Sequence, residues 1–283
     1  MNRPLRSFAA VVLALLCSGP LAREACADFL LGVTYYDNQL IKIDTTTGVG
    51  SLVGNLSTNV GAFGLSQYNG NLYTFDSTLD RVAQINSTTG ATMADINVGI
   101  GPVLGQGGMA IRSDGIGFLT SALDPSTFNP VNDVFSFNLA TGKSTLLSTS
   151  PTGPTLAGLA FLGNTLYGLG KLDGMLYTVN QSTGLATAVG SLGYLPGNPF
   201  ESLSAGPGGT LYATLDDRLF SINTATGLAT PIDPNPANDS GFSSISGLVS
   251  PAAVPEPSSI VLVAVGLGSA LIVPHRWRGR RVR

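Results

Sequence analysis

The repeating unit of this chain is clearest between Leu72 and Gly99, which read LYTFDSTLDRVAQINSTTGATMADINVG. The unit consists of an alternating run, a polar turn, a second alternating run and a Thr-Gly step that ends at Gly90. Tyr, Phe, Val and Ile at every second position are typical of strands with one or both faces packed. A glycine after the threonine favours a short hairpin loop, because it adopts the left-handed conformation without a Cβ clash.

The Thr-Gly step recurs five times, each time after an apolar residue and an Asp or Asn. The copies are IDTTTG ending at Gly48, INSTTG at Gly90, FNLATG at Gly142, VNQSTG at Gly184 and INTATG at Gly227. Their spacings are 42, 52, 42 and 43 residues. The long spacing contains DPSTFNPVN (Asp124–Asn132), which has the composition of an inserted loop. Self-similarity at this period predicts a repeat architecture.

A further apolar run precedes each unit and opens with small residues, which suit a crowded centre. These runs are FGLSQY from Phe63, GMAIRS from Gly108, GLAFLG from Gly158, SLSAGP from Ser202 and SGLVSP from Ser246. Four strands in about 40–45 residues is the size of a β-propeller blade. The first blade, from Phe29, has no such run before it, and the last run has no blade after it. We therefore expect the two ends to pair.

This pattern predicts an all-β fold over residues 28–251: a five-bladed β-propeller of four-stranded antiparallel blades, closed by its N- and C-terminal strands. Closure would remove the exposed inner edges that otherwise template aggregation. An open β-solenoid or a sandwich built from the same hairpins is the alternative.

The first 27 residues have the layout of a secretory signal peptide. It comprises a basic start, an apolar run and a small-x-small cleavage pattern: Arg3 and Arg6, Phe8–Cys17, and Ala25 with Ala27. Cleavage is expected before Asp28. A lipoprotein interpretation of Cys17 is disfavoured, because Leu16 stands where a small residue is required.

The exported domain is poor in reactive side chains and acidic. Cys17 and Cys26 lie in the signal peptide and His275 lies in the C-terminal tail, so the domain is predicted to contain neither thiol nor disulfide. From Asp28 to Ser250 there are fifteen acidic and six basic residues, a net charge of −9. A base-poor, negative surface repels phosphate backbones, so we expect no nucleic-acid partner.

The C-terminal segment changes in composition after the repeats. Residues 252–259 form a Pro-rich linker that contains Pro255, Glu256 and Pro257. Residues 260–283 begin with fourteen apolar or small residues, IVLVAVGLGSALIV, which as a helix rise about 21 Å against the ~30 Å core of a bilayer. Such a helix spans a membrane only marginally. A charge cluster follows: Arg276, Arg278, Arg280, Arg281 and Arg283. Because arginines favour the cytoplasmic side, the domain is expected to face outward.

This order of motifs resembles the PEP-CTERM tail that directs exported bacterial proteins to an exosortase. The resemblance implies transient inner-membrane anchoring, cleavage near the Pro-Glu-Pro motif by an exosortase-type peptidase, and release or attachment at the cell surface. It also implies extracellular polysaccharide or biofilm matrix as a partner. A permanent single-pass anchor would use the same residues. Within the domain, the stretch from Leu72 to Gly99 resembles the YVTN-type propeller repeats of surface proteins.

The domain offers little catalytic chemistry. The absence of Cys and His excludes cysteine nucleophiles, Ser-His-Asp triads and His-ligated metals, and we assign no catalytic residue. Aspartates at turns usually accept hydrogen bonds from nearby backbone amides. No cofactor is assigned, and calcium is the best remaining small partner because the domain offers hard oxygen ligands. The candidate ligands are Asp76, Asp80, Asp216 and Asp217.

We therefore expect an exported, non-enzymatic propeller that acts as an interaction or matrix module at the cell surface or outside the cell. Signal peptidase and an exosortase-type peptidase would be its partners during export. A hydrolase or lyase that acts on extracellular polymers through aspartates at the channel mouth is the alternative, and a self-associating structural protein is a third hypothesis. Two candidate rim loops are Asp124–Asp133 and Leu192–Glu201.

Overall fold

The structure is a computed structural model that describes residues 28–57, 61–101, 107–123, 126–127, 130–150, 152–171, 173–195, 197, 201–232 and 240–251. These residues belong to one compact unit, residues 27–252. The predicted signal peptide, with Ala25 and Ala27, lies outside them, as do the linker with Pro255, Glu256 and Pro257 and the segment 260–283 with its arginines. Among the described residues, no helix is long and apolar enough to cross a membrane.

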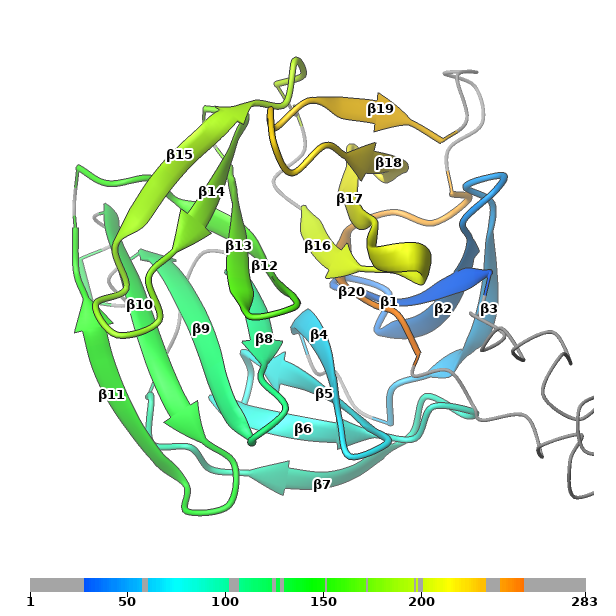
Figure 1. Cartoon of the computed structure of the whole chain (residues 1–283). Coiled ribbons are helices and arrows are strands. Elements are labelled where there is room, and N and C mark those ends of the chain that lie inside the picture. Colours follow the sequence, from blue (N-terminus) through cyan, green and yellow to red (C-terminus); the bar gives the residue numbers. More distant parts are fainter. Residues whose placement is uncertain are drawn as a thin grey trace, which may run out of the picture. The chain divides into compact units, whose positions relative to one another are not determined.

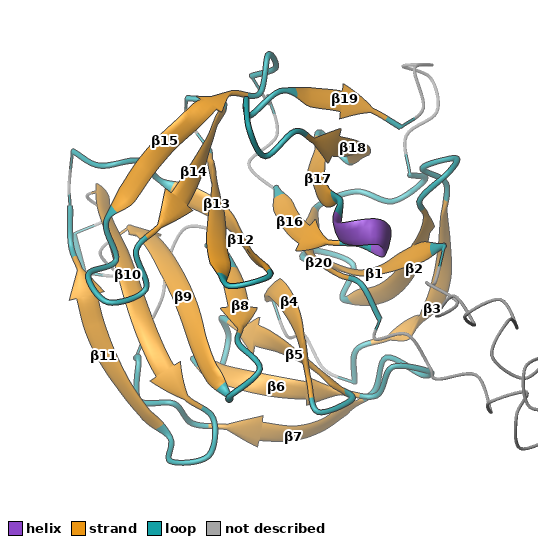
Figure 2. Cartoon of the chain, viewed as in Figure 1, coloured by secondary structure: helices purple, strands orange, loops and turns teal. Residues whose placement is uncertain are grey.

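The described residues form twenty strands in five four-stranded antiparallel sheets, which we call blades 1 to 5. The blades stand around a centre (Figure 1), and a short 3-10 turn, Pro207–Gly209, lies between two strands of blade 5 (Figure 2). From the centre outward, blade 1 contains β20 (Ile245–Val249), β1 (Phe29–Thr34), β2 (Gln39–Asp44) and β3 (Gly50–Asn55). Blade 2 contains β4 (Ala62–Tyr68), β5 (Asn71–Asp76), β6 (Arg81–Ile85) and β7 (Thr92–Ile96).

The other three blades repeat this order from the centre outward. Blade 3 contains β8 (Met109–Ile111), β9 (Ile116–Leu123), β10 (Pro130–Asn138) and β11 (Lys143–Ser148). Blade 4 contains β12 (Leu156–Leu162), β13 (Thr165–Gly170), β14 (Met175–Val179) and β15 (Ala186–Ser191). Blade 5 contains β16 (Ser202–Ala205), β17 (Leu211–Leu215), β18 (Arg218–Ile222) and β19 (Ala229–Pro231).

The two ends of the domain close the ring, as predicted. Strand β20 pairs antiparallel with β1, with Leu31 opposite Val249 and Gly32 opposite Leu248. The inner strands β20, β4, β8, β12 and β16 each contact the next, and β16 contacts β20. The fold is therefore a closed five-bladed β-propeller. The open solenoid and the sandwich are excluded.

The small residues at the start of the inner strands are required by the narrow centre. A Cβ at any of four glycines would lie within 3 Å of the next inner strand: 2.5 Å from Met109 at Gly64, 2.2 Å from Leu159 at Gly108, 2.9 Å from Leu203 at Gly158 and 2.7 Å from Gly64 at Gly247. Real Cβ atoms do not approach other atoms so closely, because interiors are already packed to crystal density. In blade 5 the corresponding residue is Ser202, which bonds to Thr214.

The Thr-Gly turns form the hairpins between the third and fourth strands of each blade. In blade 1 the carboxylate of Asp44 accepts hydrogen bonds from the amides of Thr46 and Thr47, both at 2.8 Å. Gly48 closes the loop with φ 74° and donates its amide to the Asp44 carbonyl at 2.9 Å. The other four turns repeat this geometry with an asparagine in place of the aspartate: Asn86, Asn138, Asn180 and Asn223.

Apolar clusters fill the five seams between neighbouring blades. The seam between blades 2 and 3, for example, packs Phe63 and Phe75 against Met109 and Phe137. The other clusters join blades 4 and 5, 1 and 2, 5 and 1, and 3 and 4. Burial of apolar surface between blades, at about 25 cal/mol per Å², stabilises the ring without any disulfide.

The segment predicted as an inserted loop, Asp124–Asn132, is partly a strand. Pro130 pairs with Leu123, so β10 begins within the insertion. The Asn132 side chain is buried and donates to the carbonyls of Ser150 at 3.1 Å and Gly153 at 2.9 Å. The loop prediction was wrong for residues 130–132, because a polar composition concealed a buried asparagine.

Candidate functional site

The five inner strands run in the same direction through the ring and end at one mouth of the central channel. We call the face on which they end the recess face and the other face the opposite face. A cavity of about 220 Å³ lies at this mouth, and each inner strand contributes three consecutive residues to its wall. The lining residues are Leu65–Gln67, Met109–Ile111, Leu159–Phe161, Leu203–Ala205 and Leu248–Ser250. We call this cavity the recess.

The first lining residue of each strand closes the channel below the recess. Leu65, Met109, Leu159, Leu203 and Leu248 are all at most 3 % exposed. The four leucines also line the narrow centre together with the glycines described above. Since side chains alternate along a strand, the third lining residue of each strand lies on the same side as the first. The recess therefore has an apolar floor and a ring of side chains around its rim.

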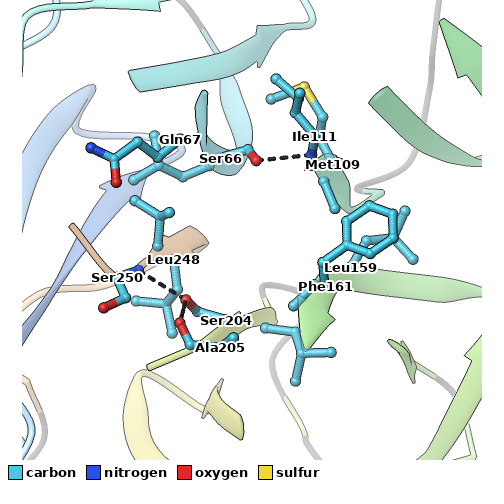
Figure 3. Close-up of a pocket in the computed structure, with 15 residues that line it drawn as sticks. Ser66, Gln67, Met109, Ile111, Leu159, Phe161, Ser204, Ala205, Leu248 and Ser250 are labelled. Carbon is cyan, nitrogen blue, oxygen red and sulfur yellow. Dashed lines mark hydrogen bonds between the residues drawn. The ribbon is translucent and has the colours of Figure 1, made fainter. Parts of the chain in front are cut away.

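Two serines in the wall tie neighbouring inner strands together (Figure 3). The hydroxyl of Ser66 accepts the amide of Ile111 at 2.9 Å, and the hydroxyl of Ser204 accepts the amide of Ser250 at 3.1 Å. Ser204 also donates to the carbonyl of Ala205 at 2.8 Å. Both serines are buried, so their role is to join blades 2 and 3 and blades 5 and 1.

The rim of the recess combines one aromatic ring with neutral polar groups. Phe161, Gln67 and Ser250 are half-buried, and the Phe161 ring packs edge-on against Phe118 with centroids 5.7 Å apart. None of the fifteen described lining residues is charged. An apolar concavity with a few polar groups is the usual form of a small-molecule site. The recess suits a neutral ligand, and its wall contains no side chain that exchanges protons near neutral pH.

The aspartates that the sequence singled out lie on the opposite face. Asp76 ends β5 opposite Ala62, the first residue of β4, and Asp80 lies in the next turn with φ 53°. The Asp76 carboxylate is 2 % exposed and accepts the amides of Thr78 at 2.8 Å and Leu79 at 3.2 Å. Burial raises the pKa of Asp76, and these hydrogen bonds oppose the shift.

Asp216 and Asp217 form the two-residue hairpin between β17 and β18, with φ 49° and 61°. Their carboxylates accept hydrogen bonds from different residues. Asp216 accepts the Tyr194 hydroxyl and, at 3.0 Å, the Gly197 amide, whereas Asp217 accepts the Ile245 amide at 3.0 Å.

No group of three or more His, Cys, Asp or Glu in the described part of the chain is arranged to hold a metal ion. Asp76, Asp216 and Asp217 accept hydrogen bonds within turns and loops. Calcium binding by the four aspartates stays a prediction.

Glu201 is a buried acid on the opposite face that the sequence analysis did not single out as a site. It precedes β16, is 2 % exposed, and neither carboxyl oxygen has a hydrogen-bond partner. Burial is the main cause that raises its pKa to about 8, and nearby Lys171 opposes the shift. A sequence signal existed: Glu201 is the only glutamate between Asp28 and Ser250. The predicted rim loop Leu192–Glu201 therefore ends in the interior.

Comparison with known proteins supports the fold alone. No protein-family model matches the chain, and a search of curated protein sequences finds no match. Among solved structures, a chain from a crystal structure of a nidogen/laminin complex aligns with a TM-score of 0.50 at 10% identity, covering 78% of this chain and 97% of that chain. A crystal structure of Myxococcus xanthus glutaminyl cyclase aligns with a TM-score of 0.43 at 12% identity, covering 76% of each chain.

Proposed function

We propose that this protein is an exported, non-enzymatic β-propeller that binds a neutral polymer, most simply an extracellular polysaccharide, at the recess. The signal peptide would deliver it across the inner membrane, and the PEP-CTERM-like tail would hold it there briefly before exosortase-type processing. The mature propeller would then act at the cell surface or in the extracellular matrix.

The uncharged, concave recess is the observation that supports binding. A volume of about 220 Å³ is enough for about one sugar ring of a polymer, so the neighbouring sugars would lie outside the recess. The apolar face of a sugar packs against an aromatic ring such as Phe161, and its hydroxyls bond to amides and hydroxyls such as those of Gln67 and Ser250. A recess without charge binds neutral groups without leaving a buried ion unpaired.

The alternative, a polymer-cleaving enzyme, draws on the acidic residues of the opposite face. Two carboxyl groups roughly 5 to 9 Å apart are the usual requirement for glycoside hydrolysis. The two hypotheses thus place the ligand at opposite ends of the channel. They also differ in whether the polymer is cut.

Binding and cleavage can be measured together on soluble dextran, mannan and xyloglucan, with anionic alginate for comparison. We expect saturable binding of a neutral polymer with no new reducing ends. Phe161→Ala and Gln67→Leu should each weaken binding at least tenfold, which corresponds to about 1.4 kcal/mol. Because Phe161 also packs in the seam, Gln67→Leu tests the site if Phe161→Ala is poorly folded.

Tyr36→Ala is the matched control for these variants. Tyr36 is 67% exposed and lies in the turn between β1 and β2 on the opposite face, so its loss should not alter binding at the recess. Release of reducing ends by the wild type, abolished by replacing acidic residues of the opposite face, would instead establish the cleaving enzyme. Binding that Tyr36→Ala weakens and Gln67→Leu does not would also overturn the proposal.

The sorting proposal has its own test. Epitope tags placed after Asp28 and after Arg283 should separate in an exosortase-producing host, and only the first should reach the surface or medium. Replacing Glu256 with alanine should leave the two tags on one membrane-bound chain. Equal processing of the variant and the wild type would mean that the Pro-Glu-Pro motif does not direct this step.

A further inference from the structure

The other four blades begin their inner strands with an apolar residue, whereas in blade 5 an acid, Glu201, directly precedes the inner strand. Ala62, Leu156 and Ile245 face the last residue of the second strand of their own blades. In blade 5, Glu201 carries a carboxyl group that is 2 % exposed and has no hydrogen-bond partner. Burying an ionised carboxylate without hydrogen bonds is costly, whereas the neutral acid is tolerated more readily.

The charges around Glu201 come from both blades of the seam. Lys171 follows β13 of blade 4 and is itself partly buried, and its attraction favours the Glu201 carboxylate. Asp173 and Asp216 repel that carboxylate from blades 4 and 5.

The two aspartates are each held by a tyrosine. Tyr177 donates its hydroxyl to Asp173, and Tyr194 donates to Asp216. Burial and the hydrogen bond to Asp216 raise the pKa of Tyr194 to about 12, and nearby Arg218 on β18 opposes that shift. Of these three carboxyl groups, Glu201 is the one whose oxygens accept no hydrogen bond.

Strand β16 connects this carboxyl group to the recess. It has four residues, Ser202–Ala205, and Leu203, Ser204 and Ala205 line the recess wall. At about 3.3 Å per residue, Ser204 lies roughly 10 Å along the strand from Glu201. The Ser204 hydroxyl is also the tie between blades 5 and 1. A displacement of Glu201 would therefore shift β16, and β16 forms part of the recess wall.

We propose that Glu201 is a protonation switch in the seam between blades 4 and 5: the neutral acid fits the closed seam, and the carboxylate loosens β16 and with it the recess wall. The inference goes beyond the proposed function, because the switch acts on the wall whether or not a polymer binds there. A polymer-binding module with this switch would hold its ligand in mildly acidic surroundings and release it in alkaline ones.

The raised pKa of Glu201 determines how the stability of the folded protein should change with pH. The pKa of Glu201 is raised from 4.5 to about 8 in the folded protein. The folded state therefore keeps a proton that the unfolded chain releases above about pH 4.5. Stability consequently falls as pH rises from about 4.5 through about 8, and levels off above that.

The switch can be tested on the full chain without any ligand. We expect the unfolding midpoint to fall by roughly 5–10 °C between pH 5.5 and 8.5. Over the same interval, amide-exchange protection should fall about tenfold in β16 and change little in β4. Glu201→Gln, which stays neutral, should abolish both changes. Asp37→Asn, which removes an exposed charge in the turn between β1 and β2, should leave both changes as in the wild type.

If Glu201→Gln fails to fold, direct titration of the Glu201 carboxyl group in the wild-type chain still tests the switch. The chain has three glutamates, Glu24, Glu201 and Glu256. Carboxyl-labelled glutamate therefore gives three resonances, and Glu24→Gln and Glu256→Gln assign the third by elimination. The proposal predicts that the Glu201 resonance titrates near pH 8. Titration near pH 4.5, equal loss of protection in β4 and β16, or an unchanged pH dependence in Glu201→Gln would each overturn it.

Discussion

Residues of the repeat signature perform two tasks, capping the turn and contacting the next blade, and only the first is evident in the sequence. The Asp or Asn of each Thr-Gly turn caps the turn, as its type and spacing indicate. The second task is contact between blades. The carbonyl of Thr226, in the turn of blade 5, lies so close to β15 that a Cβ at Gly190 would approach it within 2.0 Å. Gly54 of blade 1 has the same relation to Thr89 of blade 2.

This contact makes Gly190→Ala a test at the scale of one residue. We expect the substitution to destabilise the domain by about 1–3 kcal/mol, because the turn of blade 5 must move away from β15. Denaturant titration followed by circular dichroism would measure the change in free energy of unfolding. Gly197→Ala is the control, since a Cβ there would meet only Asp216, at 3.9 Å. Equal stability of Gly190→Ala and the wild type would contradict the close approach.

At the scale of elements, alternation and turn residues predict the strands well. The runs from Phe63, Gly108, Gly158, Ser202 and Ser246 correspond to the inner strands β4, β8, β12, β16 and β20. Bulges are not visible in the same pattern. The register shifts between Phe63 and Leu65, and between Val33 and Thr34. A bulge adds one residue on one strand only, so alternation along that strand cannot locate it.

The candidate site was less predictable than the strands that build it. The sequence predicts a rim loop at Leu192–Glu201, yet Glu201 is buried in a seam. The recess is instead formed by the ends of the inner strands, whose sequences resemble any buried strand. Which three residues of each strand reach the mouth depends on how the five strands are staggered around the centre. A single strand does not contain that information.

At the scale of the whole molecule, the distribution of charge separates the two faces. The recess wall carries no charge among its described residues, whereas Asp76, Asp216 and Glu201 lie on the opposite face. The domain's net charge of −9 is therefore not spread evenly around the channel. A neutral polymer would meet little electrostatic cost at the recess, and salt should change its affinity only weakly.

The recess depends on ring closure, because β20 supplies one fifth of its wall. Closure can be tested with an engineered disulfide between Leu31 and Val249, which are register partners in β1 and β20. The variant Leu31→Cys/Val249→Cys is made in a chain with Cys17→Ser and Cys26→Ser, so that no other thiol is present. A second variant, Leu31→Cys/Leu147→Cys, places the partner in blade 3 and serves as the control.

Cross-linking of Leu31→Cys/Val249→Cys under mild oxidation is the measurement that tests this architecture most directly. We predict rapid loss of both thiols within the monomer, and a gain in stability of up to about 4–5 kcal/mol, because the bond closes a very long loop. The control pair should stay reduced. If the first variant folds but keeps both thiols free, the ends of the domain do not pair, and neither the ring nor its recess exists.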